Sequence, residues 1–348
     1  MGKPCTHSLL PRWAYADANK EKGSQETLGG VVQGYNAECL RPPRPSAGAP
    51  PVMQAEPLLT WSEPVREFID FVSLFLANGA IGFRYAAVRG RLTEEGASAE
   101  ARAVYGRATR RAAGLGLVGA VAQAVLLLLR LPHLAERMHR SVGQLLTSDP
   151  QTIARCVLLP AAIVGFALAR RTSRSRAWLV AAVGLIGAQL AVVLSGRWVG
   201  LVNPAHQLFG SLWLGTLLVL VLAGLSSVLR DAPRLRGSIA ADMVNGFSPL
   251  ALTAGPLLVA TGITTALIHL HPFSSLYTTP YGYALLVKLC FVALVFILGA
   301  WNWRRQRPRL GSEKAAGRIR RSAIMELSVA TIVLIVTSIL VSLPSPRH

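Results

Sequence analysis

Long apolar runs alternate with short polar stretches along most of this chain. A helix that crosses a membrane needs about 20 consecutive apolar residues, and eight segments come near that length. Because the bilayer interior satisfies no backbone polar group, apolar runs this continuous predict helices. The eight segments are 67–88, 112–131, 152–169, 177–196, 205–229, 247–270, 282–303 and 322–343. The pattern therefore predicts an all-α integral membrane protein built as a bundle of about eight transmembrane helices.

The first part of the chain differs from the rest. Residues 1–60 are rich in Pro, Gly, Ala and charge, and show no sustained period of 3.6 or 2. Such a composition is typical of a disordered segment, because it buries too little apolar surface to offset the loss of chain entropy. We therefore divide the chain into a disordered tail (1–60), the first four transmembrane helices (61–200) and a second four-helix group (201–348).

The basic residues predict the orientation of the bundle. The first, third, fifth and seventh loops carry seven, four, three and eight Lys and Arg residues, whereas the intervening loops carry three, one and none. Loops on the cytoplasmic side hold an excess of Lys and Arg. The bias of 22 against 4 places the odd-numbered loops inside. Both termini are therefore expected outside the cytoplasm.

Composition excludes several classes of function. Only 15% of the 348 residues are charged, against about a quarter in a soluble domain. The net charge of +19 would favour nucleic-acid binding if it formed a patch, but the basic residues lie in short clusters between apolar runs, so no nucleic-acid partner is expected. No Walker A loop or Asp-Lys-Thr-Gly phosphorylation motif is present, and the four cysteines show no CxxC spacing. The sequence predicts a membrane protein that is not an enzyme.

The histidines test the orientation independently. On the expected topology all seven lie in an outer tail or loop, or at the outer end of a helix. His206 opens the fifth segment from outside, while His269 and His271 close the sixth, and Cys290 lies in the outer half of the seventh. Imidazole and thiolate are ligands that suit copper. We interpret His206, His269 and His271 as candidate metal ligands that meet at one depth, Cys290 as a further candidate below them, and the other histidines as ordinary interfacial residues.

Charged residues inside the predicted helices are also candidates, because charge is costly in a membrane. Lys288 lies about two turns into the seventh segment from outside, where it either snorkels or holds an anionic partner. Glu326 lies about a turn into the eighth from inside, where it could neutralise the arginine-rich seventh loop. Glu67 and Asp70 mark the outer edge of the first segment, where they are either solvated or attract a cation.

An ordered series of motifs carries a family resemblance. The sequence HQLFGSLWLGTLL (206–218) is similar to a His-x-x-x-x-x-x-Trp-x-Gly helix. It is followed by FSPLALTAGPLLVATG (247–262), TPYGYALLVKL (279–289), WNWRRQRPRL (301–310), Glu326 and LPSP (343–346). In this order the motifs resemble the copper resistance protein D (CopD) family of bacterial inner-membrane proteins.

The resemblance implies a function for the chain. It suggests a multi-pass copper transport and copper resistance protein of the plasma (inner) membrane, which moves copper ions inward from the outer side and has a periplasmic or extracellular copper-binding protein as a possible partner. Two alternatives remain open at this stage. One is a membrane haem-binding redox protein, which would need axial histidines facing one another within helices. The other is a copper-delivery assembly subunit without transport activity.

Overall fold

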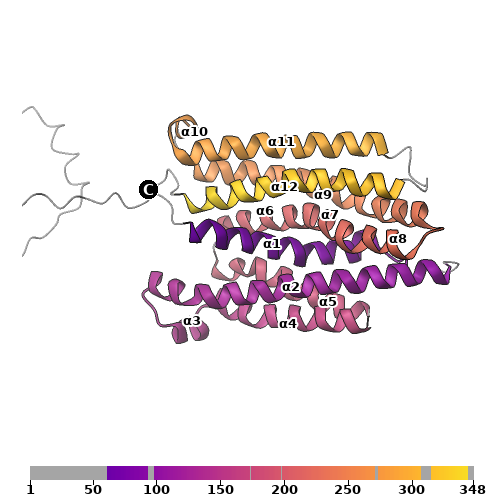
Figure 1. The fold of residues 1–348 in the computed structure, drawn as a ribbon. Helices are drawn as coiled ribbons and strands as arrows, with labels where there is room; N and C mark the ends of the chain where they lie inside the picture. The colour runs from indigo at the N-terminus through magenta and orange to yellow at the C-terminus, as the bar shows by residue number, and fades with distance from the viewer. Residues whose placement is uncertain are drawn as a thin grey trace, which may run out of the picture. The chain divides into compact units, whose positions relative to one another are not determined.

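The structure, a computed structural model, is a bundle of helices (Figure 1). It describes residues 61–92, 98–172, 174–196, 198–270, 273–306 and 315–343, and no strand occurs in these ranges. The described residues belong to one compact unit that spans 57–348. The predicted tail, 1–60, lies outside them. The all-α class is confirmed, whereas the predicted division of the bundle near residue 200 stays a prediction.

Twelve α-helices follow one another along the described part of the chain. They are α1 (Ser62–Gly82), α2 (Ala99–Arg137), α3 (Val142–Ser148), α4 (Pro150–Thr172), α5 (Ser175–Leu190), α6 (Val202–Gly210), α7 (Thr216–Val219), α8 (Ser226–Asp231), α9 (Arg236–His269), α10 (Ser275–Thr278), α11 (Pro280–Gln306) and α12 (Ala315–Ser342). Two 3-10 turns, Ala191–Ser195 and Trp198–Leu201, connect α5 to α6. Three π-helical segments, Phe83–Ala87, Ser211–Gly215 and Leu220–Leu225, continue or join α-helices.

Seven helical stretches of the described chain are long and apolar enough to cross a membrane. Each contains or nearly contains one of the predicted segments from 112–131 onward. The fifth, Val199–Asp231, is one continuous run made of α6, α7, α8 and the π-helical segments between them. The first predicted segment, 67–88, is also helical, but α1 carries Arg66, Glu67 and Asp70 close to its start and is not among the seven.

Helix α1 lies inside the bundle and contacts helices from both predicted halves (Figure 1). It packs on α2 on one side and on α12 and the Ser211–Val219 region on the other. The approach to that region is close at Gly79 and Gly215: a β-carbon on Gly79 would collide with the Gly215 carbonyl group, and one on Gly215 with the Phe75 carbonyl. Small residues allow helix backbones to approach closely in membranes. The two glycines therefore set how deeply α1 sits in the bundle.

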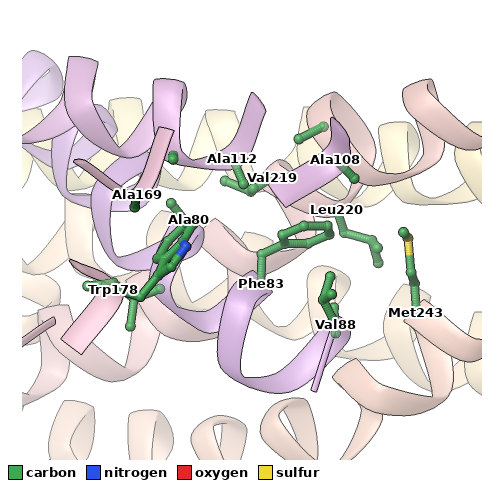
Figure 2. Packing of buried hydrophobic residues seen from close by; sticks show 14 of the residues in the cluster. Ala80, Phe83, Val88, Ala108, Ala112, Ala169, Trp178, Val219, Leu220 and Met243 are labelled. Carbon is green, nitrogen blue, oxygen red and sulfur yellow. The ribbon is translucent and has the colours of Figure 1, made fainter. Parts of the chain in front are cut away.

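The core around α1 combines small residues with a few large ones (Figure 2). Ala80, Ala108 and Ala112 are fully buried, and Phe83 and Trp178 fill the space beside them. Trp178 also meets the fully buried Phe166 edge to face, with ring centroids 5.8 Å apart. Alanine at the crossings brings the helices together, and the aromatic rings fill the remaining space. Such packing holds α1 against α2 and α5, and α4 against α5.

Candidate metal-binding site

His206 projects from α6 onto α9. Its Nδ1 lies 3.1 Å from the Leu258 carbonyl oxygen and 3.2 Å from Thr261 Oγ1. The ring covers Gly262, where an added β-carbon would come within 2.9 Å of the imidazole Cε1. Glycine at this position thus leaves the space that the imidazole occupies.

This contact determines which ring nitrogen of His206 is available to a metal. A carbonyl oxygen only accepts hydrogen bonds, so the bond to Leu258 places the proton on Nδ1. Nε2 then carries the free lone pair. Histidines that bind metals usually donate their other ring N–H to a carbonyl or carboxylate, which fixes the tautomer and the orientation of the ring. His206 is held in the form that a metal ligand requires.

His269, at the end of α9, repeats the arrangement. Its Nδ1 lies 2.9 Å from the Thr265 carbonyl oxygen one turn earlier in the same helix, which again leaves Nε2 free. The Thr265 hydroxyl donates a hydrogen bond of 3.2 Å to Asn203 Oδ1, so this end of α9 is tied to the start of α6. The two described histidines of the predicted site therefore lie on α6 and α9, which are in contact. In both, Nδ1 bonds to a backbone carbonyl and Nε2 takes no part in that hydrogen bond.

The two histidines do not lie at one depth, contrary to the expectation from the sequence. The His206 ring is level with Leu258–Gly262, and His269 comes seven residues after Gly262. At 1.5 Å per residue, about 10 Å of helix axis separates them. The difference arises because His206 lies within α6 and reaches α9 well before that helix ends. His271 lies outside the described residues.

Cys290 does not join the histidines in the described structure. It is exposed on α11, on the outward face of that helix. Among the residues that the structure describes, no group of three or more His, Cys, Asp or Glu side chains is placed to hold a metal ion. The assignment of His206, His269, His271 and Cys290 as ligands therefore stays a prediction.

Lys288 lies on α11, the helix that also carries Cys290. The two roles considered for it, snorkelling and holding an anionic partner, stay predictions.

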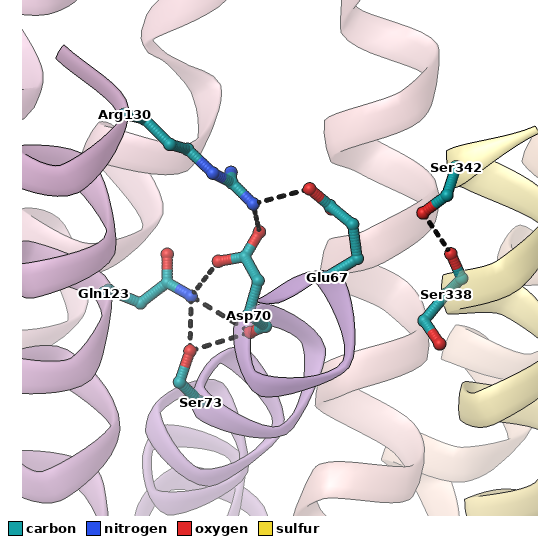
Figure 3. Close-up of polar contacts among 7 residues, drawn as sticks. All are labelled: Glu67, Asp70, Ser73, Gln123, Arg130, Ser338 and Ser342. Carbon is teal, nitrogen blue, oxygen red and sulfur yellow. Dashed lines mark hydrogen bonds and ion pairs between the residues drawn. The ribbon is translucent and has the colours of Figure 1, made fainter. Parts of the chain in front are cut away.

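A charged cluster joins α1 to α2 near one end of the bundle (Figure 3). Arg130 Nη2 lies 2.9 Å from Glu67 Oε1 and 3.1 Å from Asp70 Oδ2. The Gln123 amide donates to Asp70 Oδ1 at 2.6 Å and also to the Ser73 hydroxyl. The cation that Glu67 and Asp70 attract is thus Arg130, at the end of the second predicted segment. Gln123 inside an apolar run was the signal that could have located this cluster.

A second polar cluster, which the sequence analysis missed, lies deep in the bundle. The Asn78 amide donates to Gln189 Oε1 at 3.0 Å and to Ser211 Oγ at 2.8 Å. Asn78 and Ser211 are fully buried. These three residues connect α1, α5 and the π-helical Ser211–Gly215 segment. Amide side chains within apolar runs were again the available signal.

Two other charged residues are satisfied by neighbouring helices. Glu326 on α12 accepts a hydrogen bond from the Asn302 amide on α11. This bond gives the carboxylate a partner on the neighbouring helix. Arg155 on α4 donates a 3.2 Å hydrogen bond to the Ala188 carbonyl on α5. Both contacts join consecutive helices.

The helices and the polar groups buried between them define a multi-pass membrane protein. Residues 241–340 match the family described as Copper resistance protein D. A curated relative, the Copper transport protein CutJ of Bacillus subtilis (strain 168), is 31% identical over 201 residues, which cover 55% of this chain and 35% of the relative. The chain thus spans about a third of that relative's length. No solved structure matches.

The family match coincides with the fold. Residues 241–340 begin within α9 and end within α12, so the match covers the helices that carry His269, Cys290, Lys288 and Glu326. The resemblance found in the sequence motifs is confirmed for this region, which matches the CopD family model.

Proposed function

We propose that this protein transports copper ions inward across the membrane from the outer side. The observation that carries the proposal is the geometry of His206 and His269, whose Nδ1 atoms are both bonded to backbone carbonyls while Nε2 stays free. Imidazole nitrogens of this kind suit copper. The region of the CopD family and the relative named as a copper transport protein support the same cargo.

The proposed path begins at the histidines. His269, at the end of α9, and His271, two residues later in the sequence, receive copper from the outside or from a copper-carrying partner protein. His206 takes the ion about 10 Å further along the helix pair. Cys290 is a softer ligand, which suits Cu(I), and is the proposed later acceptor.

The proposed direction requires eight transmembrane helices with both termini outside. We expect a reporter inserted in the 304–321 loop to be active only in the cytoplasm, and a reporter fused after Pro346 to be active only outside. The physical reason is the 22-to-4 bias of basic residues between the two sets of loops. Phosphatase and fluorescent-protein fusions measure the two locations. A cytoplasmic carboxyl terminus would contradict both the orientation and the outer location of the histidines.

The decisive experiment measures copper uptake in vesicles of defined orientation. Right-side-out vesicles that contain the full-length protein should accumulate more copper than vesicles without it, and inverted vesicles should not. Copper bound by the protein without accumulation in either kind of vesicle would identify a delivery subunit. A haem absorption band in the purified protein would favour the redox alternative.

A further inference from the structure

A basic cavity opens between three helices at the end of the bundle where α8 ends and α12 begins. Its volume is about 260 Å³. Its basic side chains come from α2, α8 and α12, and two apolar residues and a serine form the remaining wall. The lining residues are Arg111, Val221, Leu222, Ser226, Arg230 and Arg320.

The positive charge of the cavity is not balanced by its own lining, which contains three arginines and no carboxylate. The nearest acidic residue in the sequence, Asp231, pairs with Arg107 at 2.9 Å instead. Arg111 donates a 2.7 Å hydrogen bond to the Ser227 hydroxyl, which holds this guanidinium in place without neutralising it. The cavity therefore attracts an anion.

The apolar wall indicates where that anion comes from. Leu222 is 48% exposed on the surface of a helix that crosses the membrane, so it faces lipid chains. Val221, beside it, is buried. An anion here meets arginines on one side and the hydrocarbon boundary on the other. The cavity is also smaller than the roughly 300–1,000 Å³ of a site that encloses a drug-sized molecule, which suits a headgroup whose chains remain outside.

We propose that this cavity binds the phosphate of an anionic phospholipid, with Arg111, Arg230 and Arg320 around the headgroup and the acyl chains along Leu222. The planar guanidinium fork matches phosphate oxygens with two parallel hydrogen bonds. Basic pockets between transmembrane helices on the cytoplasmic side are suited to such headgroups. The bound lipid joins α2, α8 and α12 across the two predicted halves of the bundle. This site does not depend on the proposed copper transport.

The test compares two double variants of the full-length protein that remove the same charge. R230Q/R320Q removes two exposed arginines of the cavity, while R110Q/R171Q removes two exposed arginines elsewhere. Short-chain phosphatidylglycerol is titrated into the purified protein in neutral detergent, and binding is measured by native mass spectrometry. Each arginine near the headgroup contributes roughly a fivefold change in affinity, so R230Q/R320Q should bind about 30-fold more weakly than the parent. R110Q/R171Q should bind like the parent.

Two further measurements distinguish the sources of phosphate and exclude misfolding. Inorganic phosphate, titrated in the same detergent, should not compete with the lipid at millimolar concentration. If it competes fully, and its binding is also lost in R230Q/R320Q, the ligand is soluble phosphate and the lipid assignment is overturned. Equal lipid binding by the parent and R230Q/R320Q overturns the site itself. Circular dichroism should show the same helix content in all three proteins, because both mutated side chains of the cavity are exposed.

Discussion

Replacing His206 with alanine lowers copper accumulation in cells at least tenfold, while the amount of protein in the membrane fraction stays at the parent level. Groups that merely orient a metal ligand are worth about 10–100-fold in affinity, so the loss of a ligand should cost no less. The fold should survive, because His206 is only partly buried and alanine leaves the Gly262 side of α9 undisturbed. Copper per cell, normalised to the membrane-inserted protein, is the measurement.

Two further variants make this result specific. His139 lies outside the proposed path with a backbone φ of 50°, which asparagine tolerates, so His139→Asn should accumulate copper like the parent. Gly262→Ala keeps the imidazole but pushes it from its position, because the new β-carbon would meet Cε1 at 2.9 Å. It should lower accumulation less than His206→Ala does. Parent-level accumulation by His206→Ala would contradict the role of this histidine.

Continuous apolar runs predicted seven of the eight transmembrane segments well, because length and apolarity alone identify them. Seven predicted segments from 112–131 onward correspond to membrane-length helices of the described chain. The π-helical segments Ser211–Gly215 and Leu220–Leu225 were not predictable in this way. A π-helical turn changes the hydrogen-bond register without changing hydropathy, and it often occurs at functional sites. Its presence depends on what the helix packs against, here α1 for Ser211–Gly215 and mainly α2 for Leu220–Leu225.

The candidate site was less predictable, because it depends on how neighbouring helices are aligned along their axes. The sequence indicates that the segments of His206 and His269 are consecutive, and α6 does pack on α9. It does not indicate which turn of α9 faces the imidazole. The same reason hid the contact of Arg130 with Glu67 and Asp70: 63 and 60 residues separate the partners, and only the packing of α2 on α1 brings them together. The residue types indicated which side chains could form a site. The depth of each side chain along its helix was visible only in the structure.

The crossing of α1 over Ser211–Gly215 gives the largest expected effect on stability. Gly79→Ala should destabilise the folded protein, because the new β-carbon would collide with the Gly215 carbonyl group. A backbone atom cannot rotate away as a side chain can, so the two helices must separate. Overpacking of this kind typically costs about 1–3 kcal/mol, and separation would also weaken the hydrogen bonds of Asn78 with Gln189 and Ser211.

The control for this prediction is another glycine within a helix. Gly317, in α12, has no atom within 4 Å of the position that a β-carbon would take. Gly317→Ala should therefore be neutral or stabilise by about 0.5–1 kcal/mol, because alanine favours the helix over the unfolded chain. Alanine's greater preference for the helix acts equally at both positions. A loss of stability in Gly79→Ala beside a gain in Gly317→Ala is therefore due to the close helix crossing. Thermal unfolding of the purified proteins, followed by circular dichroism in one detergent, measures both. If Gly79→Ala is as stable as Gly317→Ala, the close approach of α1 to Ser211–Gly215 is wrong.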